Sequence, residues 1–114
     1  TAFLATPESK AHDVHKSLLV SGDHKGTKIT RAFSGRPARG LVNTMMNMLE
    51  KKPENILPFP YQHALTSKVR AEAARQSKAE YLPMWAGQGA GMVRNQSTEE
   101  IILALAEGLE IALR

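Results

Sequence analysis

One short strand-like stretch in an otherwise helical sequence places the strongest constraint on the fold. From Thr27 to Phe33, β-branched and basic residues alternate, as in a strand whose two faces have different surroundings. No second stretch with this pattern is evident, and a strand without a neighbour leaves its main-chain N–H and C=O groups unpaired. The chain is therefore either all-α with extended connections, or its strand pairs with polypeptide outside this sequence.

The start of the chain predicts a helix preceded by a short apolar run. Thr6 and Pro7 are typical of a helix start, and Gly22 is a typical C-terminal stop. Between them, apolar residues recur at helical spacing. The preceding run from Ala2 to Ala5 resembles the end of a buried strand, although the sequence has no strand from which it would continue.

Three further helices are expected. One has an apolar face from Leu41 to Leu49, and a second is marked by apolar residues every four positions from Tyr61 to Ala73. The third follows a capping box at residues 97–100. The connection from Lys51 to Pro60 contains three prolines and should be irregular.

Composition excludes several classes of protein. The 114 residues include no cysteine, which excludes disulfide frameworks, zinc–thiolate sites and thiol catalysis. No apolar run approaches the roughly 20 residues that span a bilayer, and no leader pattern is present. We expect a soluble protein of a reducing compartment, most simply cytoplasmic, without a membrane partner.

The net charge of +4 is unevenly distributed. No acidic residue lies between His24 and Leu49, whereas five Lys or Arg residues fall between Lys25 and Arg39. This stretch could bind phosphate or RNA. The more ordinary interpretation is a solvated basic face, or arginines that pair with acids elsewhere, because Phe33 is the only aromatic ring nearby for stacking bases.

The segment from Trp85 to Gly91 is the most distinctive candidate site. Glycines let main-chain amides approach a ligand closely, and Gln88 can both donate to and accept from a heterocycle. The alternative is a tight turn whose glycines serve packing. The spacing is not that of a dinucleotide-binding loop, because no strand precedes it at the required place.

Other polar groups are weaker candidates. His12 and His15 are three residues apart on the expected first helix, but without a third ligand nearby they are interpreted as surface histidines, and no metal site is expected. Gln62, His63 and Lys68 follow a proline-rich segment and could face either a pocket or solvent. No Ser-His-Asp set, carboxylate pair or phosphate-binding loop can be argued from spacing.

Taken in order, these segments resemble the C-terminal part of the nitronate monooxygenases, also called 2-nitropropane dioxygenases. The matching stretches are Thr1 to Ser9, Thr30 to Gly40, Pro58-Phe59-Pro60 with Gln62, Leu65 and Thr66, and Trp85 to Gly89. Together they span most of the chain.

The resemblance implies a fold. The family is FMN-dependent and combines a TIM (β/α)8 barrel with a smaller helical substrate domain. On this basis the chain is a mainly α fragment with little strand. Residues 1–24 would form the last barrel strand end and its helix, residues 25–92 the helical substrate domain, and residues 93–114 a helix that packs on the barrel. The remaining N-terminal barrel polypeptide would be its partner.

The resemblance also implies a reaction, namely oxidation of alkyl nitronates by dioxygen to a carbonyl compound and nitrite. Thr1 matches a phosphate-contacting position, and Gly87 and Gln88 would lie near the flavin. The substrate pocket would include Phe59, Gln62, His63, Lys68 and Trp85. The family's catalytic histidine lies upstream of the matched region, so no catalytic residue is assigned within this chain.

Two alternatives stay open. The first is an enzyme of the same architecture that reduces enoyl-thioesters or quinones with NAD(P)H. The choice of substrate is open because some relatives carry two tyrosines and a lysine where this chain has Phe59, His63 and, displaced by one position, Lys68. The other alternative is a basic phosphate- or RNA-binding module. The leading hypothesis expects no nucleic-acid partner.

Overall fold

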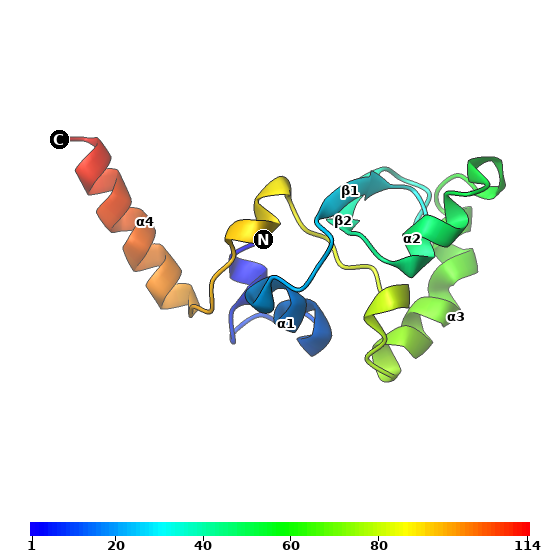
Figure 1. The fold of residues 1–114 in the computed structure, drawn as a ribbon, viewed down its shortest axis with the longest axis horizontal. Coiled ribbons are helices and arrows are strands. Elements are labelled where there is room, and N and C mark those ends of the chain that lie inside the picture. Colours follow the sequence, from blue (N-terminus) through cyan, green and yellow to red (C-terminus); the bar gives the residue numbers. More distant parts are fainter.

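The molecule is elongated, and its N-terminal part lies between the C-terminal helix at one end and a β-hairpin with two helices at the other (Figure 1). The computed structural model describes all 114 residues and measures 53 × 29 × 23 Å. Its radius of gyration is 16.1 Å, whereas a compact chain of this length would have about 13 Å. Only 22 residues are buried, so most helices have a face that the chain itself does not cover.

The N-terminal part contains a 3₁₀ helix, η1 (Phe3–Ala5), and helix α1 (Asp13–Ser21). The prediction of a strand end at residues 2–5 is wrong, since the main chain there closes 3₁₀ turns on itself. The helix also starts later than expected. The Thr6 hydroxyl donates to the Phe3 carbonyl instead of capping a helix, and His12 Nδ1 accepts the Val14 N–H at 3.1 Å as the true cap.

The end of α1 agrees with the sequence. Gly22 has a left-handed φ of 73°, and its N–H donates to the Leu18 carbonyl. Glycine adopts this conformation without a steric penalty, and it commonly terminates helices for that reason.

A β-hairpin begins the second part. Strand β1 (Thr27–Thr30) pairs antiparallel with β2 (Ala38–Leu41). The strand expected from Thr27 is therefore present, and the expectation that its partner lies outside this sequence is wrong. A third extended segment adds to β2 on its other side. The Leu41 N–H donates to the Met84 carbonyl, and the Ala86 N–H donates to the Arg39 carbonyl. The main-chain groups of β2 are therefore paired within the chain.

Helices α2 (Thr44–Leu49) and α3 (Tyr61–Arg75) pack beside the hairpin (Figure 1). Helix α2 starts three residues later than its apolar pattern suggested, because Leu41 belongs to β2. Asn43 caps α2 by accepting the Met46 N–H at 3.2 Å. The irregular proline-rich connection to α3 is confirmed, with a single 3₁₀ turn, η2 (Pro53–Asn55).

Helix α3 presents an unexpected face to the hairpin. Its buried side chains are Gln62, Thr66 and Ala73. Of the apolar residues that indicated the helix, Tyr61, Leu65 and Val69 are exposed. The periodicity located the helix correctly but not the side that packs within this chain.

Two clusters form the core. The larger one joins α1, β2, the end of α3 and the segment from Leu82 to Ala90. The 3₁₀ helix η3 (Ala79–Tyr81) precedes that segment, and η4 (Gln88–Met92) overlaps its end. The smaller cluster contains Phe33, Met45 and Met46.

The C-terminal helix α4 (Thr98–Ala112) projects away from the rest of the molecule (Figure 1). The expected cap is present, since Ser97 Oγ accepts the Glu100 N–H. Ile101 is the only buried residue of this helix, and Leu105 and Leu109 are each 62% exposed. No helix of the structure combines the length and the apolar character needed to cross a bilayer.

Candidate functional site

The N-terminus lies directly beside the glycine-rich segment. Thr1 Oγ1 accepts the Gly87 N–H at 2.8 Å, although 86 positions separate the two residues. A Cβ added to Gly87 would lie 3.5 Å from the Thr1 hydroxyl oxygen, which is an ordinary van der Waals distance. The structure thus brings together two of the three residues that the sequence proposed for cofactor binding, and Gln88 follows immediately.

The arrangement around Gly87 fits an anionic group. The Thr1 hydroxyl accepts from Gly87 and keeps its own O–H for donation. The N–H groups of Gln88 and Gly89 begin η4 and have no acceptor within the chain. The Thr1 hydroxyl and two free amides of consecutive exposed residues are donors of the kind that phosphate oxygens accept from.

A depression of about 300 Å³ contains three of the five predicted substrate-pocket residues, Phe59, His63 and Trp85. Its other lining residues are Phe33, Ser34, Ala38, Arg70 and Pro83. Four rings therefore surround it, which favours a small ligand with an apolar part. We call it the aromatic pocket.

Trp85 is fixed in the aromatic pocket by two contacts. Its main chain forms a β-bridge with Gly40, and its ring meets Phe33 edge-to-face with centroids 5.6 Å apart. At Gly40 an added Cβ would lie 3.1 Å from the indole and 3.0 Å from the Met84 carbonyl oxygen. Glycine at this position therefore allows the tryptophan segment to lie against β2.

The Phe59 side of the aromatic pocket depends on the hairpin loop. The Arg36 guanidinium lies 4.1 Å from the Phe59 ring centroid, a cation–π contact. The Phe59 and His63 ring centroids are 6.2 Å apart. Residues 34–37 belong to this loop, and Gly35 has a φ of 93°.

Arg70 is the charged residue of the aromatic pocket that the sequence interpretation did not identify. Its Nε donates to Thr66 Oγ1 at 3.1 Å and its Nη2 to the His63 carbonyl at 2.8 Å. Arg70 lies seven residues after His63, two turns along the same helix face. The sequence shows that His63 and Arg70 share a helix face, but it does not show which face of α3 borders a pocket.

Gln62 and Lys68 do not line the aromatic pocket. Gln62 is 2% exposed, and its amide connects two main-chain segments. Its Nε2 donates to the Ala32 carbonyl at 2.8 Å, and its Oε1 accepts the Leu57 N–H at 3.0 Å. In this chain Gln62 therefore holds α3 against the hairpin, while the Lys68 side chain is exposed.

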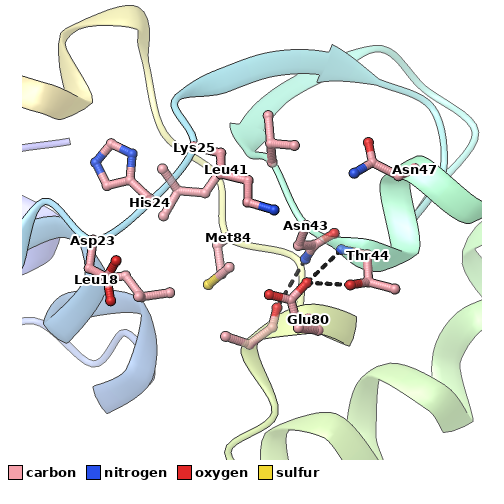
Figure 2. Close-up of a pocket in the computed structure, with 12 residues that line it drawn as sticks. Leu18, Asp23, His24, Lys25, Leu41, Asn43, Thr44, Asn47, Glu80 and Met84 are labelled. Carbon is pink, nitrogen blue, oxygen red and sulfur yellow. Dashed lines mark hydrogen bonds between the residues drawn. The ribbon is translucent and has the colours of Figure 1, made fainter.

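A second depression, of about 330 Å³, lies between the end of α1 and the start of α2 and contains none of the predicted site residues. Figure 2 shows Glu80 directed toward Asn43 and Thr44 at its edge. The Thr44 hydroxyl and N–H both donate to Glu80 Oε2, which lowers the pKa of Glu80. Asn43 Nδ2 donates to the Ala79 and Leu82 carbonyls. These bonds hold η3 on α2, so the polar groups have structural partners.

The histidines of α1 differ from expectation. His12 caps the helix and its Nε2 lies 2.8 Å from the Ala74 carbonyl oxygen. His15 is buried, with 6% of its surface exposed, so its assignment to the surface is wrong. Burial lowers the pKa of His15, repulsion from His12 adds to this, and the Trp85 main chain opposes it. No group of three His, Asp or Glu side chains with metal-binding geometry is present.

Several basic side chains of residues 25–39 have partners within the chain. Arg31 Nε donates to the Gly35 carbonyl, and Arg39 Nη1 donates to Thr27 Oγ1 at 3.2 Å. Lys28 forms an ion pair with Glu50 at 2.6 Å. The hairpin uses these cations to organise its own loop and edges.

Comparison with known proteins identifies the family of this chain. The sequence profile of the nitronate monooxygenase family matches residues 1–108. A probable nitronate monooxygenase of Bacillus subtilis is 43% identical over 89 residues, which cover 78% of this chain and 26% of that protein. A probable nitronate monooxygenase of Staphylococcus haemolyticus is 33% identical over 99% of this chain and 32% of its own length.

Two solved structures share the fold. The nitroalkane oxidase from Streptomyces ansochromogenes superposes with a TM-score of 0.84 at 39% identity, over 99% of this chain and 33% of that one. FabK from Thermotoga maritima gives a TM-score of 0.72 at 25% identity, over 96% and 35%. The chain thus spans about a third of the length of these proteins. With 108 of its 114 residues matched by the family profile, this chain belongs to the nitronate monooxygenase family.

Proposed function

We propose that this chain is the C-terminal portion of an FMN-dependent enzyme that oxidises alkyl nitronates with dioxygen to a carbonyl compound and nitrite. The observation that carries the proposal is the contact between Thr1 and Gly87, which places the Thr1 hydroxyl beside the segment that carries the free amides of Gln88 and Gly89. The proposed reaction is that of the family to which the chain belongs, and the proposed cofactor contact is with these residues of the chain.

In this proposal residues 1–24 border a TIM barrel formed by upstream polypeptide, residues 25–92 form the substrate domain, and residues 93–114 return to the barrel. The exposed apolar face of α4 supports this arrangement, since Leu105 and Leu109 need a cover that the chain does not provide. A cytoplasmic location is consistent with the absence of cysteine.

FMN, when bound, would supply the electron acceptor for the nitronate carbon. The Thr1 hydroxyl and the amides of Gln88 and Gly89 would bind its phosphate by donating hydrogen bonds. Only Ala86 separates Trp85 of the aromatic pocket from Gly87, so one short segment connects the proposed cofactor contacts with the pocket.

The aromatic pocket would hold the substrate. Phe33, Phe59 and Trp85 offer apolar surface to the alkyl group and limit the access of water. Gln62 would act indirectly by positioning α3, and Lys68 would reach substrate only if the complete enzyme brings its exposed side chain to the pocket. The catalytic base would come from the barrel, because no side chain of this pocket is assigned that role.

The full-length protein that contains this chain is the material for the test. Purified with FMN and given an alkyl nitronate, it should consume dioxygen and release nitrite without a nicotinamide nucleotide. A Thr1→Val variant keeps the shape of the side chain but removes its hydroxyl, and it should bind FMN more weakly. Absence of both oxygen uptake and nitrite in the FMN-loaded enzyme would refute the assigned reaction.

A further inference from the structure

Arg70 is fixed at the edge of the aromatic pocket by neutral groups only. Its Nε donates to Thr66 Oγ1, and its Nη2 donates to the His63 carbonyl and lies 3.3 Å from His63 Nδ1. Thr66 is itself fixed, because its hydroxyl donates to the Phe33 carbonyl at 2.6 Å. The guanidinium therefore has a defined position.

The positive charge of Arg70 has no counter-charge in this chain. The ion pairs of the structure involve Lys28, Arg75 and Arg114, and none involves Arg70. Its Nη1 makes no hydrogen bond, so two N–H donors remain free. A half-buried guanidinium without a carboxylate favours an anionic ligand at the free donors.

The neighbouring surface restricts what that anion can be. Phe33, Phe59 and Trp85 line the same depression, whose volume is about 300 Å³. A ligand that binds both the Arg70 guanidinium and these aromatic side chains has a compact anionic group and a small apolar group. Nitronate oxygens share one negative charge in a plane, which matches the planar donor pattern of a guanidinium.

We propose that Arg70 binds the anionic oxygens of the nitronate through its free Nη1, with the alkyl group directed at the aromatic side chains. This inference rests on the proposed function for the identity of the anion. Arg70 would then distinguish the charged nitronate from the neutral nitroalkane of the same carbon skeleton, because only the former gains a charge-assisted hydrogen bond.

Binding to the full-length enzyme whose FMN has been reduced beforehand tests the proposal without turnover, because a reduced flavin cannot oxidise the nitronate. Anaerobic calorimetric titration with propyl-2-nitronate and with neutral 2-nitropropane gives both dissociation constants. In Arg70→Gln the Kd for the nitronate should rise about 10- to 100-fold, as expected for loss of a charged hydrogen bond. The Kd for 2-nitropropane should change less than about twofold, and Arg70→Lys should recover part of the nitronate affinity.

The matched control is Arg75→Gln on the same helix. Arg75 is exposed, is paired with Glu72 and does not line the aromatic pocket, so this change removes one positive charge without removing a pocket residue. Nitronate affinity should be unchanged in the control. Equal loss of affinity for both ligands in Arg70→Gln, or no loss for either, would overturn the proposal. If the wild-type enzyme binds nitronate in an Arg70-dependent way but forms no nitrite, the proposed reaction fails while this inference stands.

Discussion

Gly35 provides the sharpest test of how the hairpin loop positions Phe59. A Cβ at this position would lie 2.6 Å from the Phe59 nitrogen, 2.7 Å from the Leu57 carbonyl oxygen and 2.8 Å from the Pro58 carbonyl carbon. All three atoms belong to the main chain, so no side-chain rotation relieves the overlap. The φ of 93° adds backbone strain for any residue with a Cβ.

The expected cost of Gly35→Ala follows from these two effects. Overpacking costs about 1–3 kcal/mol and an unfavourable positive φ about 1–2 kcal/mol. The substitution should therefore destabilise the substrate domain by about 2–5 kcal/mol. The proline-rich segment should also shift, which would displace Phe59 and raise the KM for nitronate in the complete enzyme.

Substitutions at two other glycines separate the cost of steric overlap from the cost of the positive φ. Gly22 has a φ of 73° with no atom within 4 Å of an added Cβ, so Gly22→Ala should cost only the strain, about 1–2 kcal/mol. Gly91 has neither feature, and Gly91→Ala should be nearly neutral. Hydrogen–deuterium exchange of the β1 and β2 amides in the full-length protein measures the local free energy of opening. If Gly35→Ala exchanged no faster than Gly91→Ala, the reasoning about this contact would be refuted.

Three further outcomes are expected. The pKa of His15 in the folded protein is lowered from 6.5, so as the pH falls the unfolded state takes up this proton more readily than the folded state. The free energy of unfolding should therefore decrease as the pH drops through about 6.5, and thermal melts of His15→Gln should lack this pH dependence. Asn43→Ala removes the cap of α2 and leaves the Ala79 and Leu82 carbonyls without their donor, which should cost about 2–4 kcal/mol in denaturant unfolding. Thr1→Val should raise the Kd for FMN about 5- to 15-fold in a fluorescence titration, and an unchanged Kd would remove Thr1 from the cofactor site.

Local signals in the sequence predicted that the four helices exist, but not where each of them starts. Gly22 and Ser97 act at the helix ends as their chemistry suggests, and the apolar spacing located α3. The start of α1 was misplaced because Thr6 and Pro7 are also good turn residues, and the Thr6 hydroxyl bonds backward to Phe3. Local propensity alone could not decide between these two uses.

Strand pairing was missed for a different reason. The β2 sequence Ala38-Arg39-Gly40-Leu41 contains no β-branched residue, and its glycine reduces strand propensity. Gly40 is nevertheless required where the Trp85 segment approaches β2. The strand is defined by neighbours on both sides, of which one lies more than 40 residues away.

The packing side of α3 could not be predicted either. Hydrophobicity favoured burial of Tyr61, Leu65 and Val69, whereas Gln62 and Thr66 are the buried residues. Their polar atoms are satisfied by main-chain groups of the hairpin, which removes the usual cost of burying them. The resemblance identified Phe59, His63 and Trp85 as neighbours, but Arg70 became visible only once the helix face was known.

Anaerobic mixing of the full-length, FMN-loaded protein with propyl-2-nitronate, followed by the flavin absorbance, tests the central claim most directly. If the cofactor contacts at Thr1 and the aromatic pocket serve nitronate oxidation, the nitronate alone should bleach the flavin, and dioxygen should restore the colour. If NADH bleaches the flavin and the nitronate does not change its absorbance, the account is contradicted and the enzyme is identified as a reductase of the same architecture.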